Sequence, residues 1–331
     1  MKEVKIYDSL VGNLNEELKD VLIKIPLSLK GKVEEIRLKR ERPLMIYFEG
    51  KDYFVSKTGN VTRDISQALI VEEKYIESTF QLISNYSPYA YLEEIKNGYI
   101  TITGGHRIGI GGKVVYGING IENIKNISSL NIRIAREKIG ISDFLIPYLI
   151  KGRKDFYNTL IISPPQCGKT TLLRDIVRNL SNGMIHSNCE GFKVSLIDER
   201  SELAGMYNGV PQKDVGLRTD ILDGCLKSDG IIMAIRSLSP DIIAVDEIGG
   251  KRDVEAIHEA LRAGIKLIAT IHGSSIHEVR EKQSMREIFE EKIFGRYIVL
   301  DRSKGVGTIK ELIDGSGNPI HFIKGAKNAI S

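Results

Sequence analysis

The stretch from Thr159 to Arg178, which reads TLIISPPQCGKTTLLRDIVR, constrains the fold more than any other part of this 331-residue chain. The apolar run Leu160–Ile162 predicts a buried strand, a turn of Pro, Gln, Cys and Gly follows, and Lys169 opens a helix with apolar periodicity. This is the context that a phosphate-binding P-loop needs. The pattern G-x-x-x-x-G-K-[ST] is broken once, because Ser163 stands where its first glycine is expected.

This stretch predicts a site for a nucleoside triphosphate. Backbone N–H groups of the turn and the first helical turn can surround an anion, and the helix dipole adds positive potential there. We expect Lys169 to reach the β- and γ-phosphates of ATP and the Thr170 hydroxyl to ligate Mg²⁺. The expected nucleotide contacts are Pro165, Gln166, Cys167, Gly168, Lys169, Thr170 and Thr171.

A second motif follows downstream, where the apolar run Ile242–Val245 ends in Asp246 and Glu247. This pattern predicts a Walker B strand, in which Asp246 holds Mg²⁺ and Glu247 orients and polarises the attacking water. One further strand, within Lys193–Arg200, separates the two motifs in sequence, as a RecA-like sheet requires. That strand also ends in carboxylates, at the edge where open α/β sheets bind ligands.

A third polar position closes the strand expected at Lys266–Ile271. His272 would lie beside the Walker B strand, where it could sense the γ-phosphate. A lone histidine at the end of a strand is usually structural, so both interpretations stay open.

The chain is long for one compact unit, and we expect two domains. Residues 1–140 would form a smaller N-terminal α+β domain, and residues 141–331 would form the RecA-like P-loop ATPase domain of an α/β protein. The expected N-terminal elements are a helix within residues 1–30, strands at Val33–Leu38 and Leu44–Phe48, a helix at Glu72–Asn85, a hairpin around Gly104 and Gly105, and a strand at Ser129–Ile134. The stretch Tyr207–Asp229 reads as loop-rich, and a C-terminal hairpin joins Arg296–Leu300 to Thr308–Ile313.

Composition adds only broad limits. The net charge of +4 suits an anionic partner without demanding one. Three cysteines without C-x-x-C spacing, Cys167, Cys189 and Cys225, argue against a disulfide framework and fit a reducing cytosol. The sequence contains neither a signal-peptide core nor 18 consecutive uncharged apolar residues, so we expect a soluble protein whose membrane role would come through a partner.

The run from Ala234 to Ser275, AIRSLSPDIIAVDEIGGKRDVEAIHEALRAGIKLIATIHGSS, resembles the core of the secretion ATPases of type II, type IV pilus and type IV secretion machines. The matching positions are Arg236, Pro240, Asp241, Glu247 and His272. The resemblance also assigns Glu199, in the acidic-box region, to support of the metal shell or the water. It implies transition-state arginines, for which Arg236 and Arg218 are candidates within the ATPase domain. Arg107 and Arg133 are candidates from the N-terminal domain, although surface salt bridges are the preferred interpretation for those two.

A resemblance to the stage III sporulation protein AA family covers nearly the whole chain. It is carried by EEIRLKRERPL (Glu34–Leu44), GYITITGGHRIGIGG (Gly98–Gly112), SLNIRIAR (Ser129–Arg136), SLIDERSELAG (Ser195–Gly205), DVGLRTDILDG (Asp214–Gly224) and VDEIGG (Val245–Gly250). The resemblance implies a hexameric ATPase that uses ATP and Mg²⁺. It would lie on the cytoplasmic face of the mother-cell membrane, with membrane proteins of a sporulation channel between mother cell and forespore as partners.

Two alternatives remain at this stage. One is a RecA-like ATPase that depends on nucleic acid, although the chain lacks the interleaved aromatic and Arg/Lys residues that build stacking platforms. The other is a nucleotide-gated ring scaffold that rarely hydrolyses ATP.

Overall fold

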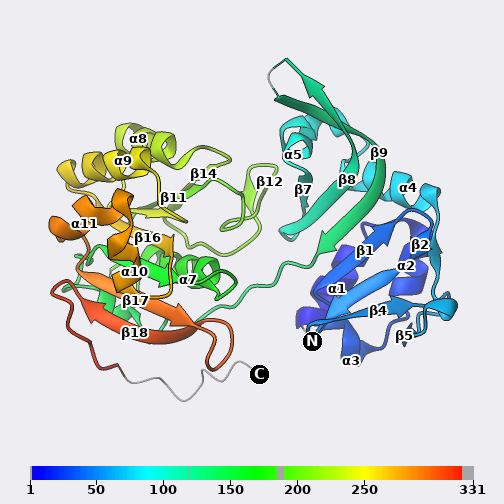
Figure 1. Cartoon of the computed structure of the whole chain (residues 1–331), viewed down its shortest axis with the longest axis horizontal. Coiled ribbons are helices and arrows are strands. Elements are labelled where there is room, and N and C mark those ends of the chain that lie inside the picture. Colours follow the sequence, from blue (N-terminus) through cyan, green and yellow to red (C-terminus); the bar gives the residue numbers. More distant parts are fainter. Residues whose placement is uncertain (1, 119, 185–189, 323–331) are drawn as a thin grey trace. The chain divides into compact units, whose positions relative to one another are not determined.

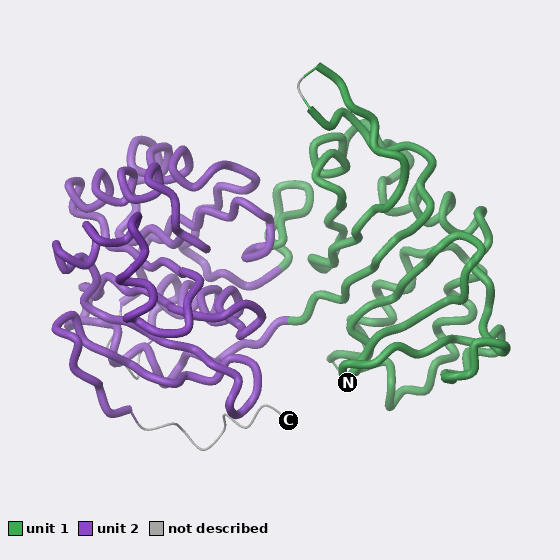
Figure 2. Tube along the Cα trace, in the orientation of Figure 1, with its two compact units in different colours: residues 1–136, 205–212 green, residues 137–204, 213–331 purple. Residues whose placement is uncertain are grey.

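The computed structural model describes residues 2–118, 120–184 and 190–322, and it divides the chain into two compact units (Figure 1, Figure 2). Unit 1 holds residues 1–136 and 205–212, and unit 2 holds residues 137–204 and 213–331. The chain therefore passes between the units three times, first near the boundary expected at 140/141. Cys189 lies outside the described residues.

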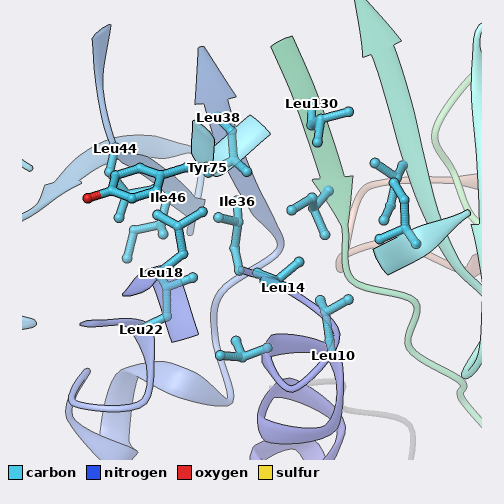
Figure 3. Packing of buried hydrophobic residues seen from close by; sticks show 14 of the residues in the cluster. Leu10, Leu14, Leu18, Leu22, Ile36, Leu38, Leu44, Ile46, Tyr75 and Leu130 are labelled. Carbon is cyan, nitrogen blue, oxygen red and sulfur yellow. The ribbon is translucent and has the colours of Figure 1, made fainter. Parts of the chain in front are cut away.

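Unit 1 begins with helices that cover one face of a sheet. The helix expected within residues 1–30 is divided into α1 (Lys2–Val11), α2 (Glu16–Leu22) and α3 (Leu27–Lys30). The first interruption lies between α1 and α2. There the Asn15 side chain accepts a hydrogen bond from the Leu18 N–H at 3.2 Å and caps the start of α2. Leu10 of α1, Leu18 and Leu22 of α2, and Leu14 between the two helices are buried against the core face of the sheet, as Figure 3 shows.

The sheet of unit 1 has the strand order β5-β4-β3-β1-β9-β8-β7. Its elements are β1 (Glu35–Lys39), β3 (Met45–Phe48), β4 (Lys51–Val55), β5 (Val61–Thr62), β7 (Tyr99–Ile102), β8 (His106–Gly117) and β9 (Gly120–Arg133), with helices α4 (Glu73–Ile83) and α5 (Leu92–Lys96) and the small pair β2 (Arg42–Pro43) and β6 (Ile70–Val71). The expected β1–β3 pair, the helix α4 and the β7–β8 hairpin are confirmed. β9 is longer than expected because it pairs with β8 over most of its length.

A short excursion of the chain, residues 205–212, completes unit 1. It forms the pair β12 (Met206–Tyr207) and β13 (Val210–Pro211). The Tyr207 hydroxyl accepts a hydrogen bond from the Asn85 side chain at 2.9 Å, and the Gln212 side chain accepts one from the Gly104 N–H at 2.8 Å. These bonds tie the excursion to residues far earlier in the sequence.

Unit 2 is built on a second sheet with the order β14-β11-β15-β16-β10-β17-β18, parallel except for the last strand. The strands are β10 (Thr159–Ser163), β11 (Val194–Asp198), β14 (Thr219–Asp223), β15 (Ile242–Val245), β16 (Lys266–His272), β17 (Arg296–Asp301) and β18 (Thr308–Asp314). Because β16 lies between β10 and β15, their carboxyl ends form one continuous edge. The expected C-terminal hairpin is confirmed as β17 and β18.

Helices cover both faces of this sheet. α8 (Lys227–Ser237), α9 (Lys251–Arg262), α10 (Ile276–Glu281) and α11 (Arg286–Glu290) contribute to the core of one face, while α7 (Lys169–Asn182) contacts the other; α6 (Ile146–Leu149) precedes β10 (Figure 1). The prediction that residues 207–229 are loop-rich was wrong in part. They contain β14, whose sequence TDILD alternates as an edge strand does, and the start of α8. No helix of the described ranges is long and apolar enough to cross a membrane.

Candidate functional site

The turn between β10 and α7 has the backbone of an anion site. Gln166 and Gly168 both have left-handed φ angles, 58° and 87°, and α7 begins directly after them at Lys169. Gly168 is the N-cap and supplies no side chain to the helix end. The first N–H groups of this 14-residue helix therefore point toward the turn without a side-chain cap, as in phosphate-binding loops.

Ser163 fits the position where the P-loop pattern has glycine. It is the last residue of β10, it is fully buried, and its φ is not in the left-handed region. Its hydroxyl donates to the Pro164 carbonyl at 2.8 Å. A serine can therefore occupy this backbone without strain, which explains why the departure from the pattern is compatible with the turn.

The two acids that follow β15 meet the start of α7. The Lys169 ammonium lies 3.2 Å from Asp246 Oδ1 and 3.3 Å from Glu247 Oε2. The Thr170 hydroxyl donates to Asp246 Oδ2 at 3.0 Å. Residues from two motifs 77 positions apart thus form one cluster.

Thr270, in the strand between β10 and β15, organises these acids and was missed by the sequence analysis. Its hydroxyl accepts a hydrogen bond from the Glu247 N–H at 2.8 Å and donates to Asp246 Oδ1. The signal that could have revealed it is a polar side chain within the apolar strand β16, two positions before His272 and therefore on the same face.

Basic side chains contact Glu247 on several sides. His272 Nε2 lies 2.9 Å from its Oε1, and Arg200 lies 3.3 Å from its Oε2. Burial alone would raise the pKa of Glu247, but Lys169, Arg200 and His272 together outweigh it and hold that pKa below its ordinary value. The carboxylate is therefore ionised at neutral pH. Its backbone has a φ of 60°, the kind of costly conformation that clusters at functional sites.

Two adjoining hollows open at this edge of the sheet. The smaller is lined by Asp198, Glu199, Arg200, Glu202, Lys227, Asp246 and Glu247. The larger has about 400 Å³ and reaches from Arg200 and Glu247 to His272 and Lys282. Glu199 thus lies beside the cluster, where it forms an ion pair with Lys227 on α8. Arg200 and Lys227, which line both hollows, were not predicted from the sequence.

Asp198, one of the residues that line the smaller hollow, is buried at the end of β11. It accepts backbone N–H bonds from Glu202, Leu203 and Ala204 at 2.8–2.9 Å. Burial raises its pKa to about 6, against these hydrogen bonds. Arg174 on α7 donates hydrogen bonds to two backbone carbonyls of the same loop, that of Leu203 at 2.5 Å and that of Glu202 at 2.9 Å. The loop after β11 is thereby fixed to the helix that begins at the P-loop.

The candidate arginines of unit 2 lie away from this cluster within one copy of the chain. Arg218 donates to the carbonyls of Ser181 and Asn182, at the end of α7, about 20 Å along the helix from Lys169. Arg236 is exposed in the last turn of α8, which leads back to the start of β15. A contact of either arginine with nucleotide stays a prediction and would have to involve a neighbouring copy.

The two candidate arginines of unit 1 lie side by side on β8 and β9, where Arg107 pairs with Arg133 in the strand register. Arg133 forms an ion pair with Glu35 at 3.2 Å, as the salt-bridge interpretation expected. The Arg107 guanidinium lies over the Tyr99 ring, 3.6 Å from its centroid.

Two oxygen donors, one at the start of α7 and one after the end of β15, could hold a magnesium ion. Mg²⁺ prefers oxygen ligands from one or two protein groups and keeps the remainder for water and phosphate. The Thr170 hydroxyl and the Asp246 carboxylate, 3.0 Å apart, offer such a pair beside the phosphate turn.

Comparisons with known proteins identify relatives of this chain in sequence and in fold. The family model described as "Sporulation stage III, protein AA" matches residues 2–320. Stage III sporulation protein AA of Bacillus subtilis is 41% identical over 314 residues, which cover 95% of this chain and 97% of that protein.

Two solved structures share the fold. The pilus retraction motor PilT with bound ADP has a TM-score of 0.53 at 15% identity, covering 89% of this chain and 80% of that chain. The ATPase DotB of Legionella pneumophila has a TM-score of 0.52 at 16% identity, covering 80% and 71%. The expected fold, a RecA-like α/β domain with an N-terminal α+β part, is confirmed. Since the family model and a close relative both span nearly the whole chain, the protein belongs to the stage III sporulation protein AA family.

Proposed function

We propose that this protein is an ATPase that hydrolyses MgATP to ADP and phosphate. The observation that carries the proposal is the meeting of Lys169 and Thr170, at the start of the P-loop helix, with Asp246 and Glu247 at the end of a neighbouring strand. A cation, a hydroxyl and two carboxylates at the N-terminus of a helix match the needs of phosphoryl transfer, which is catalysed mainly by positioning and charge stabilisation.

Each residue has a role that follows from its place. The turn and the first N–H groups of α7 would bind the β- and γ-phosphates, and Lys169 would turn from the acids to the phosphate oxygens. Mg²⁺, when bound, would neutralise charge on those oxygens, and Thr170 and Asp246 would hold it.

Glu247 would orient the attacking water and accept its proton, for which the ionised carboxylate described above is suited. The water oxygen would bond to the γ-phosphorus while the bond from that phosphorus to the β–γ bridging oxygen breaks, leaving ADP. His272, within hydrogen-bond distance of Glu247 Oε1, would hold the carboxylate in this orientation and respond to the γ-phosphate. Glu199 would support the water or metal shell from the adjoining hollow.

We further propose that the active form is a homohexamer with MgATP between subunits. Because Arg218 and Arg236 lie away from the cluster within one copy, a neighbouring copy would have to bring one of them to the phosphates; Arg107 and Arg133 are the corresponding candidates in unit 1. An arginine supplied in this way can increase the rate about 10³- to 10⁵-fold, so an isolated subunit should hydrolyse ATP slowly.

The biological role that we propose follows from the family. A sporulation protein with the fold of a pilus retraction motor and of the ATPase DotB would drive, or assemble, a secretion-like channel between mother cell and forespore during endospore formation. It would act at the cytoplasmic face of the mother-cell membrane, with membrane proteins of the channel as its partners.

Two variants test the enzymatic proposal. Lys169→Ala should abolish nucleotide binding, because the cation between the phosphates and acids is lost. Glu247→Gln should still bind MgATP but stop hydrolysis, because only the water-orienting carboxylate is replaced. Calorimetric titration with ATP and a phosphate-release assay distinguish the two. Full hydrolysis by Lys169→Ala would refute the proposal, and wild-type turnover by Glu247→Gln would move the base elsewhere, first to Glu199.

A further inference from the structure

The loop between β17 and β18, residues 302–307, touches the P-loop and has no role in the chemistry described above. The Gly307 N–H donates to the Cys167 carbonyl at 3.0 Å. A Cβ added to Gly168 would lie 3.1 Å from Val306 Cγ1 and 3.2 Å from Gly307 N, so the two loops pack closely at this point. The phosphate turn therefore has a second wall, supplied by the C-terminal hairpin.

The strand order indicates whether the nucleoside or the terminal phosphate of a bound nucleotide would lie beside the loop of residues 302–307. The terminal phosphate must lie near Glu247, which follows β15. β15 lies on one side of β10, beyond β16, whereas β17 lies on the other side. A triphosphate lying along the turn with its γ-phosphate toward Glu247 therefore directs its nucleoside toward the loop between β17 and β18.

The loop presents an apolar surface at this place. Val306 is 45% exposed, although its Cγ1 is packed near Gly168. The loop is ordered by its own hydrogen bonds, since Thr308 Oγ1 donates to the Gly305 carbonyl at 2.7 Å and Asp301 accepts from the Ser303 N–H at 3.1 Å. An exposed valine on an ordered loop is a suitable surface for the face of a base, because nucleotide sites are lined largely by apolar side chains.

We propose that the loop of residues 302–307 binds the nucleoside part of the nucleotide, with Val306 packing against the base and ribose. The inference rests on the proposed function, because it requires phosphates on the P-loop. It makes Val306 the residue by which the site distinguishes a nucleotide from a bare polyphosphate.

The test compares two ligands, MgATP and magnesium tripolyphosphate, which share the phosphate chain but differ in the nucleoside. Their dissociation constants are measured by calorimetry on the full chain for wild type, Val306→Ala and Val306→Thr. Val114→Ala, which truncates a valine that is 41% exposed on β8 in unit 1, is the matched control.

Val306→Ala should weaken MgATP binding about three- to tenfold and leave tripolyphosphate binding unchanged, because only contacts with the nucleoside are lost. Val306→Thr keeps the shape of the side chain and should weaken MgATP binding less than Val306→Ala does. The control Val114→Ala should bind both ligands as tightly as wild type. Equal weakening of both ligands would overturn the inference by showing that Val306 supports the phosphate turn, and an unchanged ATP affinity would also overturn it. A wild-type protein that binds neither ligand would instead show that the proposed function itself is wrong.

Discussion

The acids of the candidate site depend on a hydroxyl in the neighbouring strand. Thr270 contacts both the Glu247 backbone and the Asp246 carboxylate, so it fixes where each acid points. The left-handed backbone at Glu247 needs such support, because residues other than glycine pay a cost there. A small polar side chain therefore sets the orientation of both acids of the proposed catalytic site.

Replacing Thr270 by valine tests this role. The side chain keeps its shape, but the Glu247 N–H loses its acceptor, and we expect kcat to fall about tenfold to a hundredfold while ATP affinity changes less than threefold. Thr270→Ser, which restores the hydroxyl, should recover most of the activity. Steady-state phosphate release and ATP titration give the two quantities. Equal losses in both variants would mean that packing, rather than the hydrogen bonds, is what matters.

At the scale of elements, the loop after β11 is fixed to α7 through buried charges. The Asp198 carboxylate accepts hydrogen bonds from three N–H groups of the loop, and the Arg174 guanidinium donates hydrogen bonds to two carbonyls of the loop. Lys213 donates to one of the same carbonyls, that of Glu202, at 2.7 Å, and burial lowers the pKa of this lysine to about 8. A movement of the P-loop helix would therefore be transmitted to this loop.

The buried Asp198 gives the stability of unit 2 a defined pH dependence. Its pKa is raised from 3.8 to about 6 on folding, so between these values the folded state holds a proton that the unfolded state releases. Stability should fall as pH rises through this window, by up to about 3 kcal/mol. Asp198→Asn should remove this slope, although its absolute stability should be lower because an amide donor replaces a carboxylate oxygen. Urea unfolding followed by circular dichroism at pH 4.5, 5.5 and 7 measures the slopes, and parallel curves for both proteins would contradict the assignment.

The elements of the site differ in how far the sequence reveals them. β10 and β15 are buried on both faces, so each is a continuous apolar run, and the motifs that follow could be placed correctly. β14 lies at the sheet edge and is short and half polar, which made it look like a loop. No local sequence pattern predicts contacts between segments that are distant in sequence. Three features of the site depend on such contacts: the ion pair of Arg200, the hydrogen bond of Thr270 and the packing of Val306 on the P-loop.

At the scale of the whole molecule, the proposed site between subunits predicts that assembly depends on nucleotide. Glu247→Gln with MgATP should run as a hexamer in gel filtration with light scattering, because bound ATP is not consumed, and Lys169→Ala should not assemble. Wild type should assemble transiently, and its rate of phosphate release per subunit should rise as the protein concentration rises. A stable wild-type hexamer with MgATP and no phosphate release would favour the scaffold alternative. Stimulation by DNA that weakens with salt would favour the nucleic-acid motor.

The excursion of residues 205–212 into unit 1 has a consequence for how this family can diverge. Its partners, Asn85 and Gly104, belong to a part of the gene more than 100 codons upstream. A single recombination event that replaced residues 1–136 would therefore separate the excursion from the side chains with which it bonds. Each exchange of unit 1 between relatives would need two coordinated crossovers around residues 205–212, so the two segments should be inherited together.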